Sequence, residues 1–95
     1  MNPIKTINGG WSDAANGWVS ETLELAGDAW LEIDLPTKGR VVIKKAEEED
    51  GPYPKALITK WGGPSFRIRI YGSTQSRYIK IITTKTPNTI QYAYI

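Results

Sequence analysis

Side chains that could carry out chemistry are few in this chain of 95 residues. It contains no histidine and no cysteine, so it lacks the most common general base, the most common transition-metal ligand and any thiolate. The run Glu47-Glu48-Glu49-Asp50 offers adjacent carboxylates, but glycoside hydrolysis needs two carboxylates that face each other across a cleft. Four successive acids repel one another, and we interpret them as a solvated loop. We therefore predict no catalytic residues and no enzyme activity.

Oxygen ligands for a calcium ion are the next chemical possibility. Asp13, Asn16, Asp28 and Asp34 carry suitable side chains, but their spacing fits no compact calcium-binding loop. Asp and Asn are also common turn-forming residues, and Asp28 lies in what we predict to be a turn. We therefore predict no metal site and no cofactor.

Tryptophan residues are better candidates for binding, because four of them in 95 residues is a high number. Trp11 and Trp18 flank a polar loop, and Trp61 precedes the glycine- and proline-rich turn at residues 62–64. Sugar rings stack on aromatic side chains through their C–H faces, and protein interfaces use the same side chains as anchors. The alternative is that these residues seal the open ends of a small core.

A basic and aromatic strand face is a second candidate. Arg67, Arg69 and Tyr71 share one face of a predicted strand, and Lys80 and two tyrosines near the end of the chain would join them if their strands lie nearby. Such a face can bind single-stranded nucleic acid or another polyanion. The alternative is a solvated face paired with acidic neighbours, and the net charge of only +2 disfavours nucleic acid as a partner. The predicted ligand or interface residues are Trp11, Trp18, Trp61, Arg67, Arg69, Tyr71, Tyr92 and Tyr94.

The elements that must position these residues are β-strands. Residues 30–35 and 66–71 alternate between apolar and polar side chains, which gives each strand one buried face and one solvated face. We predict an all-β fold, a compact antiparallel β-sandwich that is jelly-roll-like, in one domain over residues 1–95. The short turn at residues 36–39 predicts a hairpin. The eight predicted strands cover residues 4–7, 19–25, 30–35, 40–45, 56–61, 66–71, 78–84 and 90–95.

Alternation also predicts which side chains are buried. Val19, Leu23 and Leu25 are expected to share one face of their strand. The last strand, residues 90–95, is apolar enough on both faces to need covering, and neighbouring copies could cover it. Deleting residues 92–95 should then abolish assembly. The predicted core is Leu23, Leu25, Leu31, Ile33, Leu35, Val41, Ile43, Ile58, Phe66, Ile68, Ile70, Ile79 and Ile81.

Several strands also match motifs of a known family. Residues 30–35 fit the pattern Trp-x-x-x-Asp-Leu, and residues 77–81, Arg-Tyr-Ile-Lys-Ile, are close to an Arg-Tyr-hydrophobic-Arg-hydrophobic strand. Residues 41–43, 65–70 and 90–95 follow in the matching order. From Trp30 onward the chain thus resembles the discoidin (F5/8 type C) and wider galactose-binding-like jelly-roll domains. The resemblance implies a jelly-roll sandwich with a binding or attachment role, often for sugars and sometimes for calcium.

Two classes of function are consistent with these features. Residues 1–5 lack a signal-peptide pattern, no apolar run is long enough to span a membrane, and the lack of cysteine suits a reducing cytoplasm or a particle assembled there. We expect a complete small protein that serves as a structural subunit, a bacteriophage virion accessory protein of the capsid-decoration, head-fibre or tail-associated kind. It would be made in the host cytoplasm and bind other virion proteins or further copies. The alternative is a carbohydrate-binding module that uses the loop tryptophans, either cytoplasmic or surface-associated, without membrane insertion.

Overall fold

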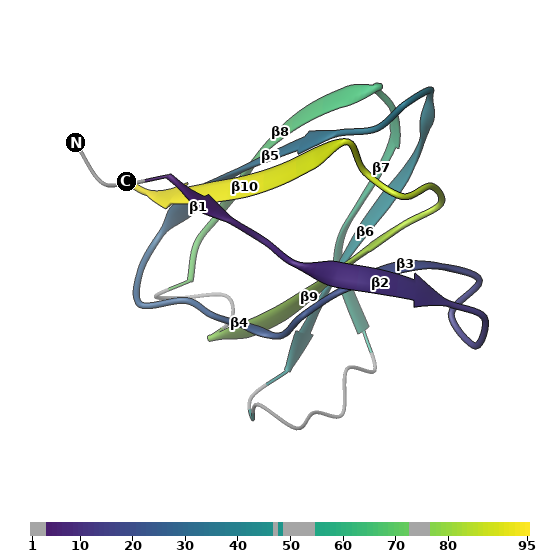
Figure 1. Ribbon diagram of the computed structural model, residues 1–95. Helices are drawn as coiled ribbons and strands as arrows, with labels where there is room; N and C mark the ends of the chain where they lie inside the picture. Colours follow the sequence, from purple (N-terminus) through teal and green to yellow (C-terminus); the bar gives the residue numbers. More distant parts are fainter. Residues whose placement is uncertain (1–3, 47, 49–54, 73–76) are drawn as a thin grey trace.

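The protein is an all-β sandwich, as predicted (Figure 1). The computed structural model describes residues 4–46, 48, 55–72 and 77–95, so most of the predicted acidic loop lies outside the described residues. Ten strands form over the described residues, two more than the eight predicted. They are β1 (Lys5–Thr6), β2 (Gly9–Ser12), β3 (Gly17–Ser20), β4 (Leu23–Glu24), β5 (Ala29–Asp34), β6 (Gly39–Ala46), β7 (Lys55–Gly62), β8 (Ser65–Ile70), β9 (Tyr78–Thr83) and β10 (Thr89–Tyr94).

The strands form two antiparallel sheets in the interleaved order of a jelly roll. One sheet has four strands in the order β1-β10-β5-β8. The other has six, in the order β2-β3-β9-β6-β7, with β4 pairing alongside β3 on the same neighbour, β9. The chain passes repeatedly from one sheet to the other, and Figure 1 shows the first such passage between β1 and β2. This interleaving is the arrangement by which jelly rolls pack two sheets over one core.

The prediction of a hairpin at residues 36–39 is wrong, because β5 and β6 belong to different sheets. The buried faces of these two strands contribute to one core from its two sides, instead of lying side by side in one sheet. Each end of the connection is hydrogen-bonded to a residue next to another strand. The amide of Leu35 donates to the carbonyl of Pro64 at 2.9 Å, and the amide of Thr84 donates to the carbonyl of Arg40 at 3.1 Å. A turn sequence alone does not distinguish a hairpin from a crossing between sheets.

A second crossing uses the glycine-rich turn that follows Trp61. Gly62 and Gly63 have φ angles of 116° and 78°, in the left-handed region that side chains other than glycine rarely adopt. The turn carries the chain from β7 in the six-stranded sheet to β8 in the four-stranded sheet. The predicted turn is therefore confirmed, and its glycines are required by the backbone.

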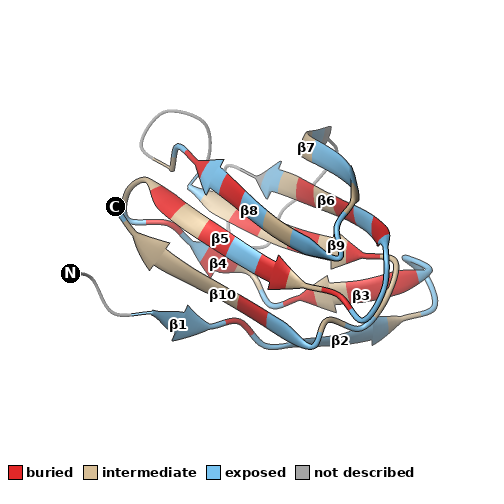
Figure 2. Cartoon of the chain, turned by 90° about the horizontal axis from the view of Figure 1, so that it is seen from above, coloured by how far each residue is buried: buried red, intermediate tan, exposed pale blue. Residues whose placement is uncertain are grey.

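The core lies between the two sheets and follows the predicted alternation (Figure 2). All predicted core residues are buried except Ile58 and Phe66, which are half-buried because they lie on the edge strands β7 and β8. Ile7, Ala29 and Ile90 are also buried, although alternation did not single them out. Their burial depends on which strands are neighbours in the sheets, which a single strand's pattern does not contain.

Alternation fails in the segment predicted as one strand over residues 19–25. The chain leaves the sheet between β3 and β4, so the two halves are out of phase. Trp18 and Ser20 therefore face the core, whereas Val19 points outward and is half-buried. The hydroxyl of Ser20 accepts a hydrogen bond from the amide of Ile81 at 2.8 Å, at the point where neither β3 nor β4 pairs with β9. A side chain thus completes the hydrogen bonding that the strand break would leave open.

The last strand is also not an edge. β10 lies between β1 and β5: it pairs with β5 over residues 89–94 and with β1 over residues 91–92. Its even-numbered residues, Ile90, Tyr92 and Tyr94, face the core side, since they pair with the inward-facing residues of β5. The chain itself therefore covers this strand. Deleting residues 92–95 would remove part of a central strand, so the deletion would test folding and not assembly.

The position of Tyr92 leads to a prediction about alkaline pH. Burial, with smaller contributions from neighbouring Tyr94 and Glu21, raises the pKa of the Tyr92 phenol above its ordinary value of about 10. The folded protein therefore holds this proton more tightly than the unfolded chain does. The free energy of unfolding should be unaffected by this group below pH of about 10 and should fall as pH rises above it.

The variant Tyr92→Phe isolates this contribution. Urea denaturation across pH 8 to 11 should show a shallower alkaline loss of stability for the variant than for the parent protein, because lysines titrate equally in both. Stability curves that run parallel through the alkaline range would contradict the prediction.

Candidate functional site

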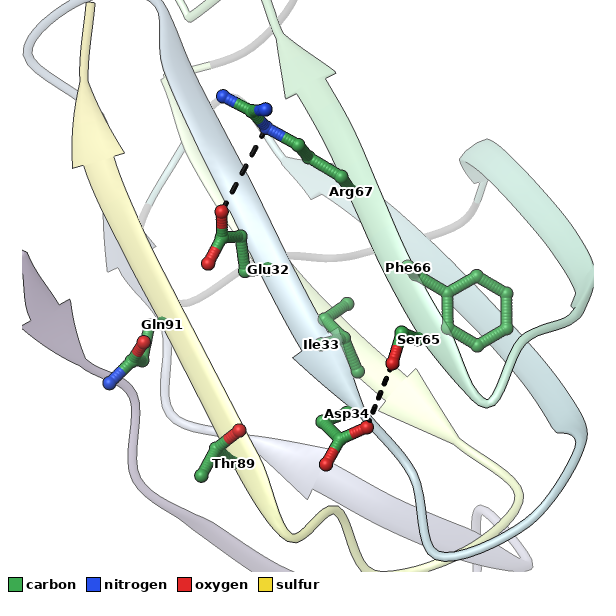
Figure 3. Close-up of a pocket in the computed structure, with 8 residues that line it drawn as sticks. All are labelled: Glu32, Ile33, Asp34, Ser65, Phe66, Arg67, Thr89 and Gln91. Atoms are coloured by element: carbon green, nitrogen blue, oxygen red, sulfur yellow. Dashed lines mark hydrogen bonds and ion pairs between the residues drawn. The ribbon is translucent and has the colours of Figure 1, made fainter.

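The candidate site is a group of neighbouring polar side chains on the outer face of the four-stranded sheet. Leu31 and Ile33 of β5 point into the core, so Trp30, Glu32 and Asp34 point outward. In the register of the sheet, Glu32 lies between Gln91 of β10 and Arg67 of β8. We call the row Gln91, Glu32 and Arg67 the polar ridge; it crosses three strands of the sheet (Figure 3).

A shallow hollow lies on one side of the polar ridge. Its volume is about 280 Å³, and beyond the ridge it is bounded by Asp34, Ser65 and Thr89 (Figure 3). The hydroxyl of Ser65 donates to Oδ1 of Asp34 at 3.0 Å, which holds that carboxylate in place. The Nε of Arg67 lies 3.8 Å from Oε1 of Glu32, and both side chains are more than half exposed, so this ion pair contributes little to stability. We call this depression the polar hollow.

A second hollow lies on the other side of the polar ridge, with a volume of about 220 Å³. Beyond the ridge it is bounded by Ile4, Trp30, Tyr92, Ala93 and Tyr94, which make it mostly apolar. We call it the aromatic hollow. The two hollows share the ridge residues, so a single ligand could contact both.

Arginine and aromatic side chains alternate along the same face. The guanidinium of Arg67 lies 4.5 Å from the ring centroid of Trp30, and that of Arg69 lies 4.9 Å from the ring of Tyr71 and 5.8 Å from that of Trp30. Guanidinium groups at these distances are attracted to the faces of the rings. Arg67, Arg69 and Tyr71 thus do lie together, as their positions in the strand predicted.

Of the remaining predicted residues, Tyr92 and Tyr94 border the aromatic hollow together with Trp30 and Arg67, whereas Lys80 does not. Tyr92 and Tyr94 face the core side, where the hydroxyl of Tyr94 donates to the carbonyl of Glu24 at 3.3 Å and accepts from the amide of Ala26 at 3.1 Å. Lys80 lies on the outer face of the other sheet, because its neighbours in β9 are buried. Lys80 therefore does not extend the basic face.

The three predicted loop tryptophans occupy different environments. Trp18 is only 6% exposed and belongs to the core, so it offers no platform to a ligand. Trp11, its partner in the β2–β3 register, is 52% exposed because β2 is an edge strand. Trp61 is 73% exposed on the opposite edge strand, β7, with the guanidinium of Arg40 5.6 Å from its ring. These residues do not form one site.

Several residues of the hollowed face were not predicted as site residues. The outward direction of Trp30, Glu32 and Asp34 follows from the alternation in residues 30–35, so this part of the signal was present in the sequence. The contribution of Gln91 and Thr89 depends on β10 pairing with β5, which the sequence alone does not reveal.

The acidic residues considered as calcium ligands lie in different parts of the fold. The described residues contain no group of three or more Asp, Glu, His or Cys side chains that could hold a metal ion. Asp13 lies in the β2–β3 turn, Asp28 just before β5 and Asp34 at its end. The described part of the chain also holds no helix long and apolar enough to cross a membrane.

Comparisons with known proteins give no relative from which a function could be carried over. No family model, no curated protein and no solved structure matches this chain. The resemblance to the discoidin and galactose-binding-like domains therefore stays a prediction from the sequence. Function has to be argued from the geometry of the fold and its surfaces.

Proposed function

We propose that this protein is a non-catalytic structural subunit of a larger assembly, specifically a bacteriophage virion accessory protein of the capsid-decoration, head-fibre or tail-associated kind. The observation that carries the proposal is the exposure of Trp11 and Trp61 on the two edge strands of the six-stranded sheet. Large exposed aromatic side chains are typical anchors of protein interfaces. The jelly-roll fold, which recurs in viral capsid proteins, supports the proposal by analogy only.

The edges that carry these tryptophans also suit contacts with neighbouring subunits. An edge strand has backbone N–H and C=O groups on one side that another chain can pair with. β2 and β7 each pair with one strand within the described residues. The proposed partners are other virion proteins or further copies of this chain, and the proposed location is the virion, after synthesis in the host cytoplasm.

The test is incorporation of tryptophan variants into the particle. Trp11→Ala and Trp61→Ala should keep the parent's far-ultraviolet circular dichroism spectrum and thermal midpoint, since both side chains are largely exposed. In a sedimentation gradient with mass-spectrometric detection, their copy number in the heavy fraction should fall about tenfold or more relative to the parent. The matched control is Tyr71→Ala, an exposed aromatic residue directly after β8 of the other sheet, which should be incorporated normally.

Two results would overturn the proposal. One is incorporation of both tryptophan variants at the parental copy number. The other is recovery of the parent protein only at the top of the gradient, as a free chain.

A second candidate function is carbohydrate binding, and the hollowed face of the four-stranded sheet favours it. That face combines an aromatic ring, Trp30, with carboxylate, amide and guanidinium side chains in two adjacent depressions. The candidate differs from the sequence-based expectation, because its platform is Trp30 on a sheet face and not the loop tryptophans. The two functions are compatible, since they use different surfaces.

A further inference from the structure

The hydrogen-bonding groups of the polar hollow restrict the chemistry of its ligand. The carboxylates of Glu32 and Asp34 only accept hydrogen bonds when ionised, and the guanidinium of Arg67 only donates. The hydroxyl of Thr89 and the amide of Gln91 can do both. A ligand that satisfies all of them must donate and accept over a short distance. Neighbouring hydroxyl groups do this.

The charges in the same hollow exclude strongly charged ligands. An anionic ligand would be repelled by two carboxylates, Glu32 and Asp34, whereas a cation would meet the guanidinium of Arg67. Arg69 of the same face lies 5.8 Å from the Trp30 ring, so the two guanidinium groups of this face, Arg67 and Arg69, balance its two carboxylates. The electrostatics therefore favour an uncharged, polyhydroxylated molecule.

The aromatic hollow supplies the complementary apolar surface. Trp30 lines it together with Ile4, Tyr92, Ala93 and Tyr94, and the guanidinium of Arg67 lies 4.5 Å from the centroid of the indole ring. The C–H face of a pyranose ring packs on an indole in the same way as other apolar groups do. A ligand that contacts both hollows thus has hydroxyl groups at one end and an apolar ring face at the other.

The spacing of the hollows sets the direction of the ligand. They lie on opposite sides of the polar ridge, and Trp30 and Asp34 are each two residues from Glu32 along β5. Two residues of a strand span about 6.6–6.8 Å, which is comparable to the length of one sugar unit. A chain of sugar units would therefore run along β5 and would cross the polar ridge at the linkage between two units.

We propose that the outer face of the four-stranded sheet is a binding site for a neutral saccharide, with two consecutive sugar units lying along β5, one in each hollow. The proposal rests on carbohydrate binding, the second candidate function above, and it is independent of the assembly proposal. It assigns the apolar contact to Trp30 and the hydroxyl contacts to the polar ridge, Asp34 and Thr89. None of the predicted loop tryptophans contributes.

Titration calorimetry of the full chain tests the site. The probes are tetrasaccharides of glucose, mannose, galactose and N-acetylglucosamine, with a galacturonic acid tetrasaccharide as the acidic counterpart. At least one neutral probe should bind, and Trp30→Leu should weaken it about tenfold or more, with Gln91→Ala also weakening it. The matched control Trp61→Leu changes an exposed tryptophan that lines neither hollow and should leave the affinity unchanged. Amide chemical-shift changes on binding should centre on residues 30–34 and 89–93.

Each contrary result has a distinct meaning. Binding that is lost in Trp61→Leu or Trp11→Leu but kept in Trp30→Leu would overturn this site while leaving carbohydrate binding in place. Tighter binding of the acidic probe would overturn the assignment to a neutral saccharide. If no probe binds, both the site and the second candidate function are overturned, and the assembly proposal is unaffected.

Discussion

Replacing Leu31 with alanine is expected to lower the free energy of unfolding by about 2–5 kcal/mol. Leu31 is fully buried in β5, between Tyr92 of β10 and Ile68 of β8 in the register of the four-stranded sheet. Truncation removes apolar contacts and leaves a cavity that the two packed sheets cannot fully close. For a domain of this size the total stability is about 5–15 kcal/mol, so this loss is large.

Chemical denaturation of the variant measures this loss directly, and the matched control is Leu57→Ala. Leu57 undergoes the same change in chemistry, but it is only partly buried on the edge strand β7. The control should therefore lose clearly less stability than Leu31→Ala. Equal losses at the two positions would contradict the assignment of Leu31 to the centre of the core.

Replacing Ser20 with alanine is expected to destabilise the protein by about 1–3 kcal/mol, although it removes only one atom from the side chain. The buried hydroxyl of Ser20 accepts from the amide of Ile81 and donates to the carbonyl of Glu21, both at 2.8 Å. Alanine would leave the Ile81 amide without this partner inside the sandwich. A buried donor that loses its acceptor has lost its hydration without compensation.

Ser12→Ala is the matched control for this change. Its hydroxyl accepts from the amide of Ala15 at 3.2 Å in the exposed β2–β3 turn, where water can replace it. The control should cost well under 1 kcal/mol by the same denaturation measurement. In addition, amide hydrogen exchange at Ile81 should be faster in Ser20→Ala than in the parent. Unchanged protection at Ile81 would show that the hydroxyl is dispensable.

The sequence predicted burial correctly where the alternation of apolar and polar residues within a single strand was enough to determine it. In β5 and β8 the alternation of Leu31 and Ile33, or Ile68 and Ile70, with charged neighbours is regular, and the burial follows it. In β3 the pattern misled, because a break after Ser20 shifts the phase and buries Trp18 in place of Val19. Local alternation predicts burial only as far as the strand is continuous.

The parts that could not be predicted depend on which strands become neighbours. Alternation correctly put Tyr92 and Tyr94 on one face of their strand, but a strand of mixed composition does not reveal which face is inside. Lys80 was expected near Arg67, yet β9 and β8 belong to different sheets. The same holds for the candidate site, since Gln91 meets Glu32 only through the register of β10 with β5.

The pairing of the first strand with the last has a mechanical consequence. β1 and β10 are antiparallel neighbours, with Lys5 opposite Tyr92 and Thr6 opposite Gln91, so the beginning of one lies beside the end of the other. Tension applied between the beginning of β1 and the end of β10 would separate the two strands from one end. Their hydrogen bonds would then break one after another instead of sharing the load in shear. In an assembly that transmits force through this subunit, contacts on the sheet faces and edge strands would therefore resist the force better than attachments at the beginning of β1 and the end of β10.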